Sequence, residues 1–244
     1  MILYGRNPVN EALRGRRAAD VADVWATAGA AREAWVRRVQ PRIVSAEEIE
    51  RRCGSAAHQG VCAYAGAYPY VSGAEILAAP EPLIVALDQV QDPQNLGSIC
   101  RTAECVGAAG VVIPERRAVE VTPAVCKASA GAVEHLRVSR VRNMADFLLD
   151  ARRAGCWCYG ASAEGGSEAR AAVPYDTPDY AGGGVVLVLG SEGSGLRPRV
   201  AKACDELIAL PLLGRIGSLG VSAAAAAVLY EILQSRQRGL DKSP

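Results

Sequence analysis

The sequence predicts an α/β protein built around a mostly parallel sheet with helices on both faces. Residues 83–87, Leu-Ile-Val-Ala-Leu, form a continuous apolar run, which is typical of a strand covered on both sides. From this run onward, strand-like stretches alternate with helical ones, and such an alternation produces parallel strands. A smaller α/β unit is predicted before it, because residues 1–65 alternate in the same way.

The composition is that of an ordinary globular protein. Of its 244 residues 50% are apolar and 22% are charged, and this length can bury one large core or two smaller ones. The net charge of +1 provides no general attraction for nucleic acid. No apolar run reaches the ~18 residues that a membrane-spanning helix needs, and the first residues carry no secretory signal. We expect a cytoplasmic protein without a membrane partner.

The eight cysteines sit mainly in apolar stretches and show no C-x-x-C spacing. Cys156 and Cys158 alternate as in a strand, so both thiols are expected on one buried face rather than in a metal or redox site. The only histidines are His58 and His135, too few for a histidine-based zinc site. We expect no metal and a reducing compartment.

Residues 1–66 are expected to form the smaller unit. Ser45 and Glu48 have the spacing of a capping box, which predicts a helix there, and Asn7-Pro8 predicts another capped helix start. Three arginine clusters in this unit favour a solvated surface, and contact with phosphate stays open. The other expected elements are a helix at 31–39 and strands at 21–25, 42–44 and 59–64.

Residues 67–82 are rich in Gly and Pro and predict a linker, with room for a short helix around Ala74–Leu77. Residues 83–244 are expected to form the larger unit. Its expected strands are 83–87, 110–113, 156–159 and 185–189. Its expected helices begin at Asn95, Thr122-Pro123, Asn143 and Val221.

A first motif, Asp92-Pro-Gln-Asn-Leu-Gly-Ser-Ile-Cys-Arg101, enters the first of these helices. Arg101 is off the apolar face and follows Gly97 by four residues, on the same side of the helix. This spacing predicts a gap beside the guanidinium for a substrate group, close to the free N–H groups of the helix start. The alternative is a surface arginine on a helix capped by Asn95.

A second motif, Leu189-Gly-Ser-Glu-Gly-Ser-Gly-Leu196, follows a buried strand. It lacks the Gly-Lys-Ser/Thr of a phosphate-binding P-loop, and Glu192 would place a carboxylate where a pyrophosphate should sit. A carboxylate suits a cationic or hydroxyl-bearing ligand better, and S-adenosylmethionine offers both a sulfonium and a ribose. The alternative is a loop with a purely structural role.

A third motif, Leu210-Pro-Leu-Leu-Gly-Arg-Ile-Gly-Ser-Leu-Gly-Val-Ser222, leads into the last helix. Its three glycines and one proline predict tight backbone curvature around a ligand or around another segment of the chain.

Together the three motifs resemble those of the SpoU (TrmH) family of RNA ribose 2′-O-methyltransferases, in the SPOUT superfamily. Residues 4–13 and 57–60 are similar to the ends of a small RNA-binding domain of L30e-like fold that precedes the catalytic domain in some members. Residues 125–134 are similar to the RlmB-type branch, which methylates a guanosine of 23S ribosomal RNA.

The resemblance implies a SPOUT-type parallel sheet with a C-terminal trefoil knot. The implied domains are an L30e-like RNA-binding domain at 1–66, a linker at 67–82 and a methyltransferase domain at 83–244. It also implies a homodimer whose active site is completed across the interface, with RNA as the substrate.

The same resemblance assigns roles to single residues. Gly190, Leu210 and Leu219 match residues that contact S-adenosylmethionine, largely through backbone groups. The residues that match the catalytic and substrate-proximal set are Asn95, Arg101, Glu192 and Ser218.

One position departs from the family pattern, because Gly220 stands where the third motif usually has Asn. Glycine lacks the amide that could hydrogen-bond near the reacting ribose. Two alternatives therefore stay open: a non-catalytic RNA-binding or ribosome-assembly factor with the same fold, and a methyltransferase that acts on transfer RNA.

Overall fold

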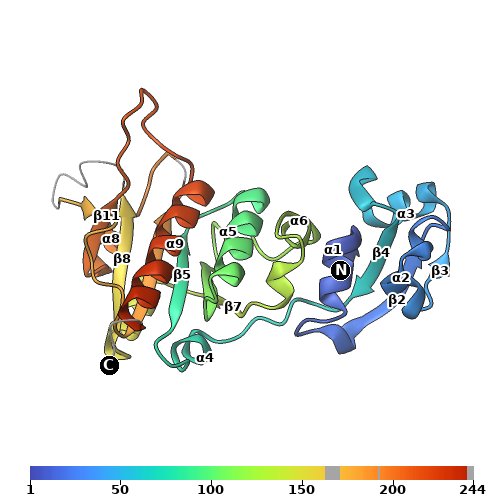
Figure 1. The fold of residues 1–244 in the computed structure, drawn as a ribbon, viewed down its shortest axis with the longest axis horizontal. Coiled ribbons are helices and arrows are strands. Elements are labelled where there is room, and N and C mark those ends of the chain that lie inside the picture. The colour runs from blue at the N-terminus through green and yellow to red at the C-terminus, as the bar shows by residue number, and fades with distance from the viewer. Residues whose placement is uncertain (163–170, 192, 241–244) are drawn as a thin grey trace.

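The computed structural model describes residues 1–162, 171–191 and 193–240, which form two sheets in separate parts of the molecule (Figure 1). The first sheet has the strand order β1-β4-β2-β3, and the second has the order β7-β6-β5-β10-β8-β11-β9. All strand pairs of the second sheet are parallel, as the sequence predicted. No helix in the described part is long and apolar enough to span a membrane.

The N-terminal unit holds the first sheet, with helices on both of its faces. Ser45 caps α3 by accepting a hydrogen bond from the N–H of Glu48, as predicted. The predicted cap at Asn7 is wrong, because α1 already begins at Arg6 and has no side-chain cap. The elements are β1 (Ile2–Tyr4), α1 (Arg6–Ala12), η1 (Ala18–Asp20), β2 (Val21–Ala26), η2 (Ala30–Arg32), α2 (Ala34–Arg38), β3 (Arg42–Ile43), α3 (Ala46–Cys53), η3 (Ala56–His58) and β4 (Val61–Ala65).

The helix expected at 31–39 is interrupted. Glu33 has an extended backbone (φ −66°, ψ 135°), which separates the single turn η2 from α2.

The connecting segment packs closely against the larger unit. It contains α4 (Gly73–Leu77), which begins with a capping box between Ser72 and Glu75. Tyr68 and Ile76 are buried, and Val71 pairs with Ser139. The connecting segment therefore contributes buried side chains to the cores of the protein.

The larger unit holds the seven parallel strands β5 (Leu83–Asp88), β6 (Gly110–Pro114), β7 (Val138–Val141), β8 (Cys156–Ser162), β9 (Val173–Pro174), β10 (Gly184–Gly190) and β11 (Glu206–Ala209). The central strands β5 and β6 are buried along their whole length. The sequence did not predict β7, β9 or β11. These strands lie at or next to the sheet edges, where short, partly exposed strands lack a continuous apolar run.

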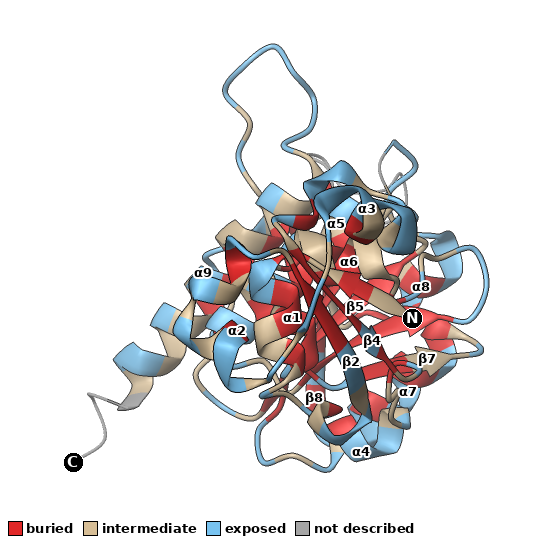
Figure 2. Ribbon diagram, turned by 90° about the vertical axis from the view of Figure 1, so that its right-hand side faces the viewer, coloured by how far each residue is buried: buried red, intermediate tan, exposed pale blue. Residues whose placement is uncertain are grey.

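Helices cover both faces of this sheet (Figures 1 and 2). Alternate residues of β5 and β10 join two separate cores, one with α5, α6 and α9 and the other with α7 and α8. The cap of α5 is Asp92, which accepts from the N–H of Gln94, so the alternative of a cap at Asn95 is wrong. The helices are α5 (Pro93–Cys105), α6 (Pro123–Ala128), η4 (Ala132–Glu134), α7 (Met144–Arg153), α8 (Pro198–Ala203) and α9 (Val221–Leu240).

A buried ion pair joins the two units where α1 faces α6 and η4 (Figure 1). Arg17 donates to both carboxylate oxygens of Glu134, at 2.7 Å and 2.6 Å, and neither side chain is exposed to solvent. Burial lowers the pKa of Arg17, but the hydrogen bond and the charge of Glu134 outweigh it and leave the pKa raised. Tyr68 adds a hydrogen bond to the carbonyl of Val133, at 2.8 Å. These contacts set the placement of the N-terminal unit.

Glu134→Gln should destabilise the protein strongly, because it keeps the shape of the side chain but leaves the buried charge of Arg17 uncompensated. We expect the free energy of unfolding to fall by about 3 kcal/mol, measured by urea denaturation followed by circular dichroism. Glu48→Gln, in a partly exposed pair with Arg52, is the control and should cost no more than about 1 kcal/mol. Equal effects of the two variants would contradict this account.

Candidate active site

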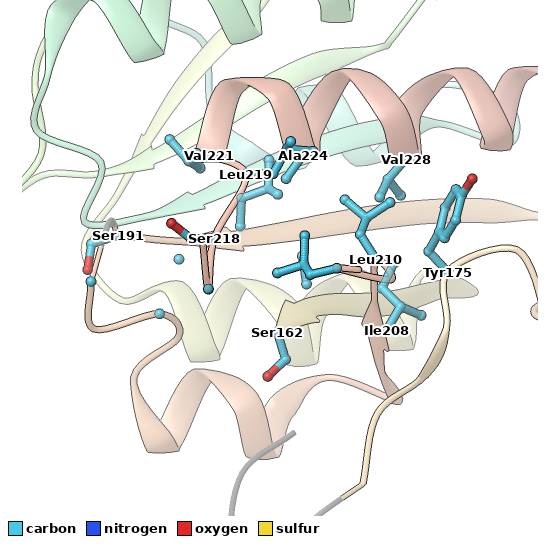
Figure 3. Close-up of a pocket in the computed structure, with 18 residues that line it drawn as sticks. Ser162, Tyr175, Ser191, Ile208, Leu210, Ser218, Leu219, Val221, Ala224 and Val228 are labelled. Atoms are coloured by element: carbon cyan, nitrogen blue, oxygen red, sulfur yellow. The ribbon is translucent and has the colours of Figure 1, made fainter. Parts of the chain in front are cut away.

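A cavity of about 690 Å³ lies at the edge of the larger sheet where β8, β10 and β11 end (Figure 3). This volume is in the range of small-molecule sites, roughly 300–1,000 Å³. Segments distant in sequence form its wall, namely the loops after β10 and β11 and the first turns of α9. The side chains labelled in Figure 3 are Ser162, Tyr175, Ser191, Ile208, Leu210, Ser218, Leu219, Val221, Ala224 and Val228.

The loop after β10 folds back tightly on Gly190. A Cβ at this position would overlap the carbonyl carbon of Gly195 and the backbone nitrogen of Leu196, so only glycine fits. Ser191 and Gly195 exchange two backbone hydrogen bonds, of 3.2 Å and 3.0 Å, that close the loop. Backbone groups rather than side chains therefore come close to the cavity here.

The loop after β11 supplies the opposite wall. Leu210, Ser218 and Leu219 line the cavity, and Gly220 leads into α9. Gly220 has φ 83°, and the space around its Cβ position is open. Asparagine adopts this left-handed conformation more readily than most residues, so the glycine here and the Asn of the family pattern are compatible with one backbone. The departure from the family pattern therefore removes a side-chain amide.

The described lining residues are neutral, and they combine apolar side chains with glycine backbone and the hydroxyls of Ser162, Ser191, Ser218 and Tyr175. A surface of this kind fits a nucleoside, whose flat base needs apolar walls and whose edge needs a few hydrogen bonds. It therefore fits the adenosine part of S-adenosylmethionine. Glu192, the expected partner of a cationic group, lies outside the described residues.

The cavity brings together four of the predicted site residues, Gly190, Leu210, Ser218 and Leu219. Asn95 and Arg101 do not line it and lie on α5, with Arg101 exposed. The start of α5 is nevertheless at the same edge of the sheet, because the last residue of β5 pairs with Gly190. The motifs thus meet at one edge, but Asn95 and Arg101 stay outside the cavity wall of their own chain.

The gap predicted beside Gly97 is wrong. Gly97 is buried, and a Cβ on it would overlap the Cβ of Ala128 and lie 2.9 Å from the backbone nitrogen of Ser129. The missing side chain lets α6 approach α5 closely, so it leaves no space for a substrate. Helical periodicity placed Gly97 correctly next to Arg101, but it could not show that another helix packs there.

An ion pair that the sequence analysis missed anchors the loop after β10. Asp88, fully buried at the end of β5, accepts from the backbone N–H of Arg197 at 3.0 Å and from its Nη2 at 2.6 Å. Asp88 is also the strand partner of Gly190, so the pair ties the far end of the loop to its beginning. A sequence signal existed, because a carboxylate directly after a buried apolar run needs a partner.

Cys156 and Cys158 share one buried face, as predicted, and both pack in one core cluster. Burial raises the pKa of Cys158 above its usual range. The residues that the structure describes contain no group of three or more His, Cys, Asp or Glu that could hold a metal ion.

Comparisons with known proteins agree with this geometry. Residues 82–230 match the SpoU rRNA Methylase family, and residues 2–71 match a family described as RNA 2′-O ribose methyltransferase substrate binding. The chain is 42% identical, over 73% of its length and 71% of the relative's, to a Bacillus subtilis protein named as a TrmH family tRNA/rRNA methyltransferase. It is 35% identical over 99% of its length to an uncharacterized tRNA/rRNA methyltransferase of Synechocystis sp., of which it covers 64%.

Solved structures have the same fold. An AdoMet-bound rRNA methyltransferase from Sinorhizobium meliloti is 26% identical with a TM-score of 0.78, over 96% of this chain and 86% of that one. The SpoU methyltransferase AviRb from Streptomyces viridochromogenes, in complex with AdoMet, has a TM-score of 0.81 at 24% identity, over 97% of this chain and 90% of that one. At that identity the second match is evidence for the fold alone.

Arg197→Met should weaken binding of S-adenosylmethionine, because it releases the anchored end of the loop after β10. We expect the dissociation constant to rise about tenfold, or ~1.4 kcal/mol, measured by calorimetry. Stability should fall as well, since Asp88 loses its counter-charge.

The double variant Asp88→Asn/Arg197→Met separates the two effects. Removing the buried charge should recover stability but not ligand affinity. Arg199→Met, in an exposed pair with Asp146, is the matched control and should change neither quantity. An unchanged affinity in Arg197→Met would contradict an anchoring role.

Proposed function

The chain belongs to the SpoU rRNA methylase family of S-adenosylmethionine-dependent RNA methyltransferases, and we propose that it methylates a ribose 2′-oxygen of a guanosine in 23S ribosomal RNA. The observation that carries the proposal is the cavity at which the second and third motifs meet. The match of residues 2–71 to a ribose methyltransferase substrate-binding family supports the 2′-oxygen as the acceptor. The resemblance of residues 125–134 to the RlmB-type branch supports 23S RNA.

Gly190, Leu210 and Leu219 are proposed to hold S-adenosylmethionine, which supplies an activated methyl group when bound. Asn95, Ser218 and Glu192 are proposed to position the target nucleotide. Arg101 is the proposed catalytic cation: a guanidinium is a poor base, but its charge stabilises an emerging alkoxide and holds the adjacent phosphate.

A homodimer is part of the proposal. Arg101 is exposed and does not line the cavity of its own chain, and in the proposed dimer it acts at the cavity of the second copy. Large apolar side chains near the cavity mouth are also exposed, among them Leu213 at 99% and Ile216 at 78%. Such a surface is typical of an interface. The active site would then be completed across the dimer.

We also propose the domain limits 1–66, 67–82 and 83–244, an L30e-like fold for the first domain, a cytoplasmic location and a C-terminal trefoil knot. The knot is supported by the path of the chain, because β10 lies between β5 and β8 and the loop after β11 returns to the same cavity before α9 packs on α5.

The function is tested by incubating purified protein with tritiated S-adenosylmethionine and total ribosomal RNA, then mapping labelled riboses by their resistance to alkali. A single protected guanosine in 23S RNA is the expected result. Labelling of transfer RNA in a parallel reaction, and not of ribosomal RNA, would overturn the proposed target and favour the alternative substrate.

A non-catalytic RNA-binding or ribosome-assembly factor is the second candidate, and Gly220 is the observation that favours it. Because the space around Gly220 is open and Asn tolerates a positive φ better than most residues, Gly220→Asn should fold. If the wild-type chain binds S-adenosylmethionine without transferring methyl groups, and Gly220→Asn transfers them, the binding-factor assignment is correct.

Arg101→Ala should reduce methyl transfer at least 100-fold, the usual cost of losing one group that stabilises transition-state charge. Cofactor affinity should not change, since Arg101 does not line the cavity. Single-turnover methylation and calorimetry measure the two quantities. Near-wild-type transfer would remove Arg101 from the catalytic set.

Mixing tests whether Arg101 acts across the dimer. Gly190→Val should disrupt the cavity in its own chain, because a Cβ there would overlap the backbone of Gly195 and Leu196 and displace the loop. Mixed with Arg101→Ala, it should restore activity, since one mixed site would contain an intact cavity and an intact Arg101. No recovery in proven mixed dimers would place Arg101 in the same chain as its cavity.

A further inference from the structure

A second cavity, of about 590 Å³, lies at the junction of the two units and the connecting segment. Strands β5, β6 and β7 begin at this cavity, whereas β10 and its neighbours end at the first cavity. The two cavities are therefore at opposite ends of the parallel strands, one where the strands begin and the other where they end. The six residues of β5 separate them by about 20 Å, at ~3.3 Å per residue.

The second cavity is strongly basic, although the whole chain carries a net charge of only +1. Three arginines line it, Arg16 from the N-terminal unit, Arg137 from the start of β7 and Arg236 from α9, against the single carboxylate of Glu81. His135 also lines it and contacts Glu11 at 2.8 Å. Arginines from three different parts of the fold therefore line the same cavity.

Two of the arginines are held by backbone carbonyls, which leave their charge intact. Arg16 donates to the carbonyls of Pro69 and Leu136, and Arg236 donates to those of Glu81 and Gly183 at 3.1 Å and 3.0 Å. Burial lowers the pKa of Arg236, a sign that its charge is partly desolvated and would gain from an anion. Because these side chains are already held in place, they would lose less conformational entropy when an anion binds.

Arg137 is exposed and forms no hydrogen bond or ion pair with any side chain that the structure describes. The nearby carboxylate of Glu75 interacts electrostatically with Arg16 and Arg137, while its Oε1 accepts hydrogen bonds from the N–H and the hydroxyl of Ser72, at 2.9 Å and 2.8 Å. The hydrogen bonds to backbone carbonyls give Arg16 and Arg236 a structural role. No comparable contact explains the position of Arg137.

We propose that this junction cavity binds a backbone phosphate of the RNA substrate, several nucleotides away from the reacting ribose. A phosphate is the acceptor that converging guanidinium groups bind best, and most phosphate contacts orient a nucleic acid without reading its sequence. Because the cavity spans both units, one such contact fixes the RNA relative to the N-terminal unit and the catalytic edge together. The inference rests on the proposed function in that RNA is the substrate.

The test compares Arg137→Gln with a matched control, Arg153→Gln, whose side chain is 77% exposed on α7, a helix of the other core. Binding of a fluorescein-labelled RNA hairpin is followed by anisotropy over a series of potassium chloride concentrations. Arg137→Gln should weaken binding about tenfold and reduce the slope of log K against log salt by about one, the effect of losing one phosphate contact. Arg153→Gln should match the wild type.

Equal behaviour of the two variants, or no RNA binding by the wild type, would overturn the proposal. A second arm titrates inorganic phosphate by calorimetry. If phosphate binding depends on Arg137 while RNA affinity does not, the cavity takes a free anion and the RNA assignment is wrong.

These readouts are separate from those of the proposed reaction. RNA binding that depends on Arg137, without methyl transfer by the wild type, would leave the phosphate site standing and remove the enzymatic function. Methyl transfer by the wild type, with RNA binding that does not depend on Arg137, would establish the enzymatic function and remove the phosphate site.

Discussion

The parallel pairing of β10 with β5 on one side and β8 on the other brings the parts of the candidate active site together. These three strands end at one edge, so Asp88, Gly190 and Ser162 come close although they are far apart in the chain. The register places Gly190 beside Asp88, and the absence of a side chain at Gly190 lets the following loop fold back against the strand end. The cavity is thus a consequence of strand order combined with one position that admits only glycine.

Two ion pairs complete this arrangement: the pair of Arg17 and Glu134 is fully buried, and the other joins buried Asp88 to Arg197, whose side chain is 44% exposed. Asp88 and Arg197 hold a loop of a few residues, whereas Arg17 and Glu134 hold an entire unit against the catalytic part. Such pairs contribute little net stability, because desolvation of the buried charge offsets the attraction, but removing the partner of a buried charge is costly. They therefore act chiefly by excluding other placements of the loop and of the N-terminal unit, while the apolar cores supply the stability.

The net charge of +1 does not show that positive charge is concentrated at one of the two cavities. The described lining of the first cavity is neutral and partly apolar, which suits a cofactor bound through backbone groups. Positive charge gathers instead at the opposite edge, in the junction cavity. A protein with a net charge near zero can in this way avoid general attraction to nucleic acid and still offer local phosphate contacts.

The sequence by itself determined the α/β class, the order of the central elements, the caps at Ser45, Thr122 and Asn143, and the three motifs, because each depends on neighbours within a few residues. The resemblance of these motifs to a known family also identified four residues that line the cavity. Only the tertiary structure decided what Gly97 faces, that Arg101 stays outside the cavity of its own chain, and that Asp88 pairs with Arg197 across 109 residues. It alone showed the convergence of Arg16, Arg137 and Arg236. These features depend on helix packing and strand order, in which residues far apart in the chain meet, and a periodicity read along one segment contains no information about which segment packs against it.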